Sequence, residues 1–288
     1  MNAWILAARP KTLAAGVVPV VVGAASAFSE SSRAWLALPC LLCALLIQIG
    51  TNLFNDHYDH LSGADGDDRV GPTRVTQSGL IASRTVLLAA CFTFVLAAVQ
   101  GVVVVVGSGE WSLLGVGAVC LVCGWLYTGG PFPLAYVGLG EVFVFVFFGL
   151  VATAGTAFAM TGTLDSTSLL AGAAVGALST CLILVNNVRD VVSDTRANKK
   201  TIAVRFGPGF ARAIYWLCVV VAAVAVVVVA VLARAPVLLA PLIALVPAVR
   251  NALVLGRLSG AALNPLLGAS ARVLFLFGVA MAVALVVA

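Results

Sequence analysis

Charged side chains are scarce in this sequence of 288 residues. Only 9% of the residues are Asp, Glu, Lys or Arg, whereas soluble domains carry about 25%. So few charges cannot cover the surface of a soluble globule of this size, which excludes a cytosolic or a disordered protein. The excess of 16 basic over 11 acidic residues is therefore no sign of a nucleic-acid binder. With 62% apolar residues, the composition predicts a polytopic membrane protein.

The apolar runs are continuous and lack the ten-residue alternation of membrane β-strands. A transmembrane helix needs about 20 mostly apolar residues, and nine such helices fit the length of the chain. The expected spans lie near 13–29, 34–53, 84–106, 112–128, 139–160, 167–188, 211–232, 236–254 and 271–288. The sequence therefore predicts an all-α fold. We expect about nine transmembrane helices in one bundle around a central cavity, forming a single domain over 1–288.

Cysteine and histidine do not form a convincing metal-binding pattern. The seven cysteines lie in apolar runs, and their two C-x2-C pairs have no further Cys or His nearby. Small buried side chains are the simpler interpretation. His57 and His60 are interpreted as polar residues at a helix end, not as zinc ligands.

The basic residues are distributed unevenly between the two sides of the predicted bundle. If nine spans alternate, Arg33 and Arg234 lie on one side and the other 14 basic residues on the opposite side. Because cytoplasmic loops are enriched in Lys and Arg, the second side is predicted to be cytoplasmic. We therefore expect a multi-pass protein of the cell inner (plasma) membrane with a cytoplasmic N-terminus.

Acidic residues concentrate in two polar loops on that same side, near 54–83 and 189–210. In the first, Asn52, Asp56 and Asp59 are spaced at i, i+4 and i+7. In the second, the same residue types recur at i, i+4 and i+8: Asn186, Asp190 and Asp194. If the preceding helices extend beyond the hydrocarbon, each set lies along one helical face.

Neighbouring carboxylates repel one another unless a cation lies between them, and oxygen ligands suit Mg²⁺. The same loops carry basic residues that could bind a phosphate: Arg69, Arg74, Lys199, Lys200 and Arg205. The pattern therefore favours a metal–diphosphate site over ordinary solvated loops with salt bridges. Gln48, Asn52, Asn186 and Asn187 lie near the apolar boundary, where they would either face a cavity or hydrogen-bond between helices.

Several segments give the chain a family resemblance. The stretches ARPKTL, NDHYDHLSGAD, DRVGPTRVTQSGLI, YTGGPFPLAYVGLGE and NNVRDVVSDTRANKKTIAVRFG cover about the first 210 residues. Together they resemble the UbiA superfamily of intramembrane prenyltransferases. Within it, the chain is most similar to the branch that prenylates 1,4-dihydroxy-2-naphthoate in menaquinone biosynthesis. One departure is Gly63, which stands where the usual motif has a third Asp; Asp65 is the predicted replacement as metal ligand.

The resemblance implies a Mg²⁺-dependent enzyme that transfers a polyprenyl group from polyprenyl diphosphate to 1,4-dihydroxy-2-naphthoate. Diphosphate and CO₂ would leave, giving demethylmenaquinone. Two Mg²⁺ ions would be held by Asp56 and Asp59 and by Asp190 and Asp194, with Asn52 and Asn186 as further ligands. Asn52, Asn186 and Asn187 are also expected to contact the substrate. The bases expected to neutralise the leaving diphosphate are Lys199, Arg205 and Arg74, with Lys200 as a further contact. Neither a protein partner nor a nucleic acid is implied.

Some alternatives stay open at this point. Tyr127, Phe132 and Tyr136 would either shield an allylic cation with their ring faces or anchor the bundle at the interface. A related reaction, such as prenylation of 4-hydroxybenzoate, would use the same motifs. A Mg²⁺-coupled transporter is the more distant alternative. Transporters built on repeats place their polar residues near the bilayer midplane, whereas the polar residues of this sequence cluster at one face.

Overall fold

The computed structural model describes residues 2–63 and 70–288. Within these ranges the chain is helical and contains no strand. The α-helices are α1 (Ala3–Ala8), α2 (Pro10–Ser26), α3 (Ala37–Leu61), α4 (Ser83–Ser108), α5 (Ser112–Leu126), α6 (Gly140–Val144), α7 (Ala152–Thr161), α8 (Ser166–Arg189), α9 (Val191–Arg196), α10 (Ile202–Leu232), α11 (Val246–Arg257) and α12 (Asn264–Val287). A π-helix, Phe145–Val151, joins α6 to α7, and a 3-10 helix, Pro236–Leu245, precedes α11.

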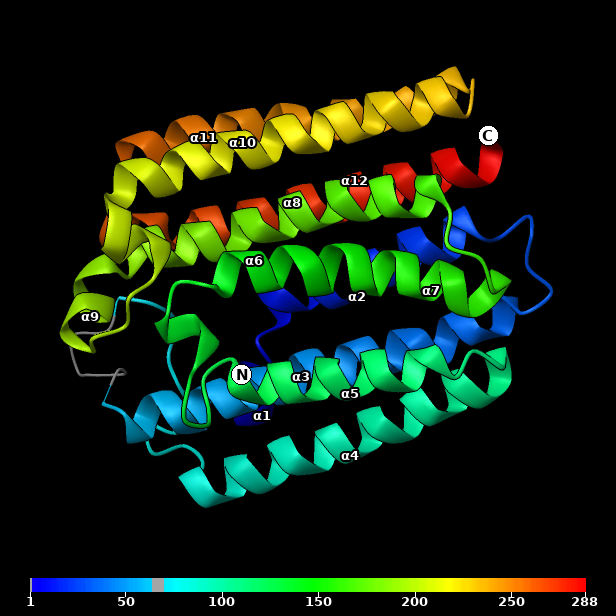
Figure 1. Cartoon of the computed structure of the whole chain (residues 1–288). Helices are drawn as coiled ribbons and strands as arrows, with labels where there is room; N and C mark the ends of the chain where they lie inside the picture. Colours follow the sequence, from blue (N-terminus) through cyan, green and yellow to red (C-terminus); the bar gives the residue numbers. More distant parts are fainter. Residues whose placement is uncertain (1, 64–69) are drawn as a thin grey trace.

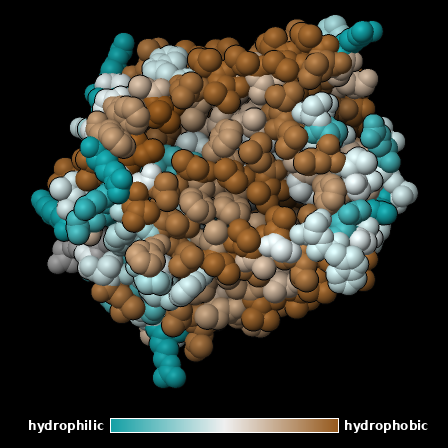
Figure 2. Space-filling view, viewed as in Figure 1, coloured by the Kyte–Doolittle hydropathy of each residue, from teal (hydrophilic) through white to brown (hydrophobic). Residues whose placement is uncertain are grey.

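The long helices lie side by side in one bundle, with α4 at one margin and α10 and α11 at the other (Figure 1). In the part of the chain that the structure describes, seven helical stretches are long and apolar enough to cross a membrane. Two shorter apolar helices, α2 and α5, match the remaining predicted spans. Apolar side chains dominate the middle of the surface and hydrophilic ones gather at its two ends (Figure 2). The predicted all-α membrane fold is confirmed.

The tightest packing surrounds α8. Its apolar window is 78% buried, against 22% for the stretch that contains α3. Its core partners come chiefly from α10 and α12, including Tyr215 and Phe277. Glycines allow the closest approach, because a Cβ on Gly176 would lie 2.6 Å from the Phe145 carbonyl oxygen. The helix that carries the second acidic motif is therefore held in a fixed position.

The two acidic loops are shorter than predicted. Helix α3 continues to Leu61, so Asp56 and Asp59 are helical. Helix α10 begins at Ile202, nine residues before the predicted start at 211. Gly207, with φ of 85°, interrupts it there, so that two helical pieces meet at a kink.

The continuation expected after the sixth span is also wrong. Helix α8 ends at Arg189, and Asp190 has φ −96° and ψ 9° before the short helix α9 begins. Asp190 and Asp194 therefore do not share one face of a single helix with Asn186. The Asp194 amide still donates to the Asp190 carbonyl at 2.8 Å, so the chain turns within a few residues.

Candidate active site

A polar cavity of about 260 Å³ opens at the end of the bundle where α3 and α8 finish. Its walls come from the α1–α2 junction, α3, the segment after Val70, the end of α8 and the α9–α10 connection. Its charged lining residues are Arg9, Lys11, Asp59, Arg74, Arg189, Asp190, Asp194 and Lys199. The structure thus brings both acidic motifs to one chamber, with more basic than acidic groups around it. Such a chamber suits a strongly anionic ligand.

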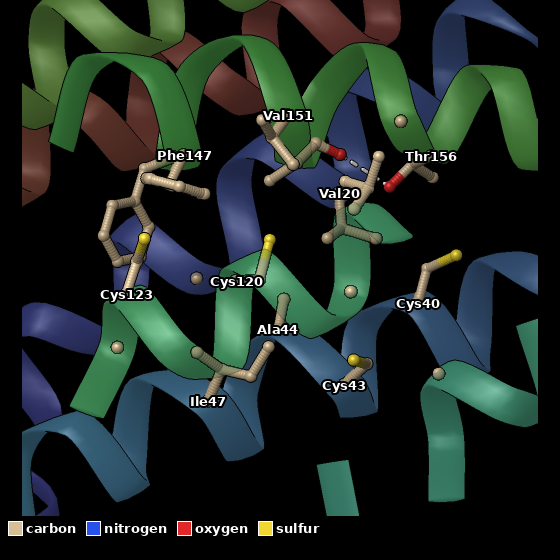
Figure 3. A pocket seen from close by; sticks show the side chains of 18 of the residues that line it. Val20, Cys40, Cys43, Ala44, Ile47, Cys120, Cys123, Phe147, Val151 and Thr156 are labelled. Atoms are coloured by element: carbon tan, nitrogen blue, oxygen red, sulfur yellow. Dashed lines mark hydrogen bonds between the residues drawn. The ribbon is translucent and has the colours of Figure 1, made fainter. Parts of the chain in front are cut away.

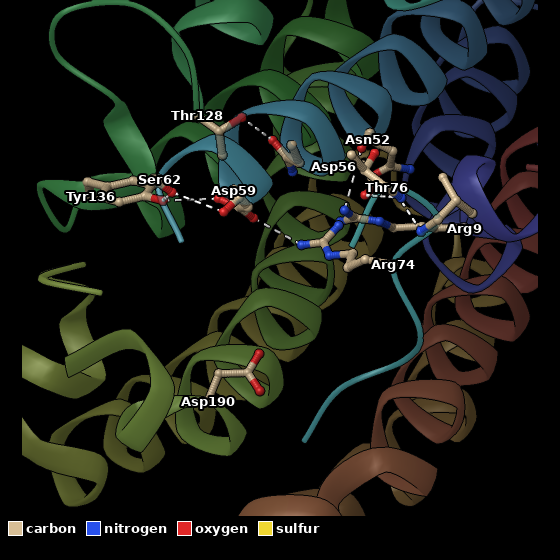
Figure 4. Close-up of polar contacts among 12 residues, drawn as sticks. Arg9, Asn52, Asp56, Asp59, Ser62, Arg74, Thr76, Thr128, Tyr136 and Asp190 are labelled. Atoms are coloured by element: carbon tan, nitrogen blue, oxygen red, sulfur yellow. Dashed lines mark hydrogen bonds and ion pairs between the residues drawn. The ribbon is translucent and has the colours of Figure 1, made fainter. Parts of the chain in front are cut away.

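Asp59 faces this chamber from the last turns of α3. Its Oδ2 lies 3.0 Å from Arg74 Nη2, and its Oδ1 accepts a hydrogen bond from the Tyr136 hydroxyl at 3.1 Å. Ser62 Oγ lies 2.9 Å from the same hydroxyl (Figure 4). Asp59 and Arg74 are both buried. The carboxylate is therefore fixed in direction before any ligand arrives.

Asp56, the other predicted metal ligand of the first motif, has different surroundings from Asp59. It is 1% exposed and does not line the chamber. Its two oxygens accept hydrogen bonds from the backbone amides of Val75 and Thr76, at 3.2 and 3.3 Å. Nearby, His57 Nδ1 lies 2.7 Å from Ser83 Oγ, and His60 Nδ1 3.0 Å from Gln77 Oε1. In this geometry Asp56 and the histidines fasten the segment after Val70 to α3.

The second motif is arranged around a buried arginine. Arg189 donates through Nε and Nη2 to the two carboxylate oxygens of Asp190, at 2.7 and 2.6 Å. Its Nη1 donates to Asn264 Oδ1 at 3.2 Å, and Asn264 Nδ2 donates in turn to the Val70 carbonyl oxygen at 2.9 Å. This chain of contacts links the second motif to the segment that follows the first. Asp194 is buried at the chamber wall.

The four predicted amides divide into two groups. Gln48 and Asn52 donate to Thr12 Oγ1, at 3.2 and 3.1 Å, so they join α3 to α2 as interhelical hydrogen bonds. Asn186 and Asn187, by contrast, line the polar chamber.

The predicted bases also divide. Lys199 lines the chamber, and its Nζ lies 5.4 Å from the centre of the Tyr136 ring. Lys200 and Arg205 are exposed and do not line it. The Lys200 amide donates to the Tyr136 carbonyl oxygen at 3.0 Å, which holds this connection against the loop before α6. Asp65 and Arg69 lie outside the described residues.

Several chamber residues were not singled out from the sequence as site residues. Arg9 and Lys11 served only as orientation signals, although they sit at the start of α2 beside the chamber. Arg9 adopts a left-handed conformation, with φ of 54°, which bends α1 away from α2. Arg189 lines the chamber, whereas its partner Asn264 does not, and the pair had no spacing signal, because Asn264 lies 75 residues further along the chain than Arg189. The only available signal for Arg9 and Lys11 was the ARPKTL resemblance.

An apolar cavity of about 200 Å³ extends into the bundle from the same region. Its walls come from α2, α3, α4, α5 and the stretch from α6 to α7 (Figure 3). Cys40, Cys43, Cys120 and Cys123 line it as free thiols. Among the described residues, no three His, Cys, Asp or Glu side chains are grouped closely enough to hold one metal ion. The cysteines therefore act here as small apolar wall residues.

Tyr127 lines both cavities and so marks their junction. It follows the last residue of α5. Burial raises the pKa of its phenol above the ordinary range, and the nearby carboxylates of Glu141 and Asp59 raise it further. Phe132, in contrast, is 75% exposed and lines neither cavity. A polar head and an apolar tail of one ligand would thus meet at Tyr127.

Comparison with known proteins agrees with this architecture. The model of the UbiA prenyltransferase family matches residues 16–267. The chain belongs to the UbiA prenyltransferase family. A relative in Mycobacterium tuberculosis, named 1,4-dihydroxy-2-naphthoate octaprenyltransferase, is 44% identical over 213 residues, which cover 74% of this chain and 72% of the relative. The protein is thus a membrane-embedded prenyltransferase, as the sequence motifs predicted.

Solved structures of UbiA homologues share the fold. The apo structure of a homologue from Aeropyrum pernix K1 has a TM-score of 0.73 at 14% identity, covering 94% of this chain and 97% of that one. A homologue from Archaeoglobus fulgidus, bound to DMAPP and Mg²⁺, has a TM-score of 0.63 at 15% identity, covering 97% and 99%. At these identities the likeness concerns the fold alone.

The chamber of this UbiA family member has a donor set that fits Mg²⁺. Mg²⁺ is usually held by one or two carboxylates, with substrate phosphates and water completing its shell. Asp59 on one wall and Asp190 and Asp194 on the other supply hard oxygen ligands of this kind. Arg74 and Lys199 line the same chamber. Separate carboxylates on opposite walls suit a metal that is completed by its ligand.

Proposed function

We propose that the chain transfers a polyprenyl group from polyprenyl diphosphate to 1,4-dihydroxy-2-naphthoate. One observation carries the proposal: a basic and acidic chamber joins an apolar cavity at Tyr127. A polyprenyl diphosphate has a charged head and a long apolar tail, so it matches both parts. The naphthoate acceptor is supported by the name of the mycobacterial relative.

We infer that the diphosphate binds between the two acidic walls. Asp59 would hold one Mg²⁺ and Asp190 with Asp194 a second, and these ions would offset charge on the phosphate oxygens when bound. Arg74 and Lys199 reach the same space and would stabilise the charge that grows on the leaving diphosphate. Asp56 keeps the segment of Arg74 in place through its two amide contacts.

The reaction balances without an oxidant. The bond between prenyl C1 and the diphosphate oxygen breaks, and a carbon–carbon bond forms to the ring carbon that carries the carboxylate. The carboxylate then leaves as CO₂, and its bonding electrons return to the ring. The product is the reduced form of demethylmenaquinone. Tyr127 remains a neutral phenol at the point where the bond forms, so its ring face can shield the allylic cation.

The location of the site follows from the basic residues. Five of the 14 basic residues that the sequence assigns to one side of the bundle line the chamber: Arg9, Lys11, Arg74, Arg189 and Lys199. We therefore propose that it opens to the cytoplasm in the cell inner membrane, where both substrates would be available.

Purified protein in detergent, with Mg²⁺ and a polyprenyl diphosphate, tests the function. Prenylated naphthoquinone and released diphosphate are followed by mass with 1,4-dihydroxy-2-naphthoate as acceptor. We expect product that is abolished by EDTA. Turnover with 4-hydroxybenzoate instead would support prenyltransferase activity but reject 1,4-dihydroxy-2-naphthoate as the acceptor. Mg²⁺ uptake into liposomes without any transfer product would favour transport.

A further inference from the structure

Glu141, in the first turn of α6, is a buried carboxylate with an incomplete set of hydrogen bonds. It is 4% exposed. Its Oε1 accepts a hydrogen bond from Asn187 Nδ2 at 2.7 Å, whereas its Oε2 has no hydrogen-bond partner within residues 2–63 and 70–288. Burying a carboxylate in this way costs free energy, and a neutral amide would join the two helices more cheaply. The buried carboxyl group therefore calls for an explanation beyond helix packing.

The contact fixes the orientation of the Asn187 amide. An amide has a donor end and an acceptor end, and the donor end of Asn187, its Nδ2, faces Glu141. Glu141 therefore takes the NH₂ end of Asn187 and leaves the carbonyl oxygen Oδ1 for another partner. Donation to a carboxylate also polarises the amide, which makes that oxygen a stronger acceptor.

Asn187 presents this oxygen at a specific depth. It lines the polar chamber and precedes Asp190 by three residues, nearly one helical turn further into the bundle. Ile183, one turn deeper again, also lines the chamber, as does Tyr127. Asn187 therefore lies between the carboxylates and the junction with the apolar cavity. At that depth an aromatic ring would meet the first carbon of a prenyl chain whose diphosphate lies at the carboxylates.

We propose that Glu141 is a positioning residue that orients Asn187 so that its carbonyl oxygen accepts a hydrogen bond from a hydroxyl group of the aromatic acceptor. The inference rests on the proposed function and adds the hydroxyl-recognition site. A hydroxyl held in this way would place the ring at the junction and keep it from rotating. Phosphate oxygens, which only accept, gain nothing from Oδ1, so the donor substrate is not the ligand of this group.

Kinetics with the two substrates varied separately provide the test. The variants are Glu141→Leu and Asn187→Leu, with Asn251→Leu as matched control, since Asn251 is a buried amide on α11 that lines neither cavity. For the first two variants we expect kcat/KM for the acceptor to fall roughly tenfold to hundredfold. The KM for the polyprenyl diphosphate should stay within about twofold of the wild type. An equal loss for both substrates would overturn the proposal.

Acceptors that lack one hydroxyl make the test specific. With 1-hydroxy-2-naphthoate and 4-hydroxy-2-naphthoate as ligands, the affinities of wild type and Asn187→Leu form two thermodynamic cycles. One analogue should bind both proteins almost equally, because it lacks the hydroxyl that Asn187 would contact. If Asn187→Leu weakens the binding of both analogues as much as it weakens the binding of 1,4-dihydroxy-2-naphthoate, Asn187 does not bind a hydroxyl and the inference fails.

Two further measurements separate this role from a merely structural one. Glu141→Gln keeps the shape and an acceptor oxygen, so it should recover most of the acceptor affinity lost in Glu141→Leu. A Glu141→Gln variant as impaired as Glu141→Leu, at unchanged thermal stability, would contradict the positioning role. Wild-type protein that does not use 1,4-dihydroxy-2-naphthoate would reject the proposed function instead. In that case, kcat/KM for the acceptor and KM for the polyprenyl diphosphate would be compared again, with the hydroxylated aromatic acid that the protein does accept.

Discussion

The two acidic motifs look alike in sequence but differ in structure. Both read Asn-x3-Asp followed by a second Asp, yet only one carboxylate of the first pair faces the chamber. Asp59 does so, while Asp56 holds the backbone of Val75 and Thr76. In the second motif the helix breaks at Asp190, and both carboxylates face the chamber. Similar spacing therefore gave different positions.

The difference arises from what surrounds each motif. The first is carried by an uninterrupted helix, so residues three apart point about 60° away from each other and can serve different partners. The second lies where α8 gives way to α9, and this change of direction brings Asp194 back to the chamber. On the continuous helix α3 the two carboxylates have different partners, whereas the break at Asp190 leaves both carboxylates of the second motif at the chamber.

The sharpest test removes one chamber carboxylate from each motif. Asp59→Asn and Asp190→Asn should each lower transferase activity by about a hundredfold to a thousandfold, because charge stabilisation at the diphosphate is lost. Activity is measured by product mass at saturating Mg²⁺. The control is Asp165→Asn, which alters a helix N-cap that does not line the chamber. Near-normal turnover by either chamber variant would break the comparison.

Asp56 should behave differently from Asp59. Asp56→Ala leaves two buried amides without partners, at a cost of about 1–3 kcal/mol each, so the thermal midpoint in detergent should fall. Proteolysis in the segment 70–82 should also become faster. The Mg²⁺ concentration needed for half-maximal activity should change less than in Asp59→Asn. A large shift in Mg²⁺ dependence at unchanged stability would place Asp56 at the metal after all.

A smaller loss of activity is expected from changing Asn264, which links the two acidic motifs. Asn264→Leu removes the bridge between Arg189 and the Val70 carbonyl oxygen, so activity should fall a few-fold. Because Asp56 holds the same segment, Asp56→Ala and Asn264→Leu should be non-additive in thermal stability, by at least about 0.5 kcal/mol. Strict additivity of the two changes would show that the motifs are independent.

The smallest effect concerns Tyr127, at the junction of the two cavities. Because burial raises the pKa of Tyr127, its phenol should stay protonated throughout the alkaline range in which the enzyme is assayed. Tyr127→Phe should therefore leave the alkaline limb of the pH–rate profile where it was. A limb that disappears in Tyr127→Phe would instead identify Tyr127 as a titrating group.

The fold was largely predictable because hydrophobic runs of helical length have few alternatives in a bilayer. Each of the nine predicted spans overlaps a helical stretch. Helix ends were less predictable, since polar residues such as Asp56 continue α3 beyond its apolar run. The prolines that interrupt the eighth span produce the 3-10 helix Pro236–Leu245 before α11 begins.

The grouping of site residues was predictable where charged residues interrupt an otherwise apolar sequence. Asp59, Asp190, Asp194, Arg74 and Lys199 were expected to share one site, and all five line the chamber. Arg189 was missed because its partner Asn264 comes from α12, a contact that depends on how distant helices pack. Asp56 was expected at the same site but does not line the chamber, because spacing along a helix does not tell which face meets the cavity and which meets a loop.

The glycine contact beneath the second motif bears on how such an enzyme can change over time. Gly149 in the π-helix meets Gly172 and Gly176 so closely that no methyl group fits between the backbones. Mutations there would move the whole wall of the apolar cavity, and most would be lost to selection. Gly117 and Gly155, which line that cavity with open space around them, can accept larger side chains at little cost. New donor lengths, or resistance to an inhibitor lodged in the cavity, should therefore arise at these tolerant positions.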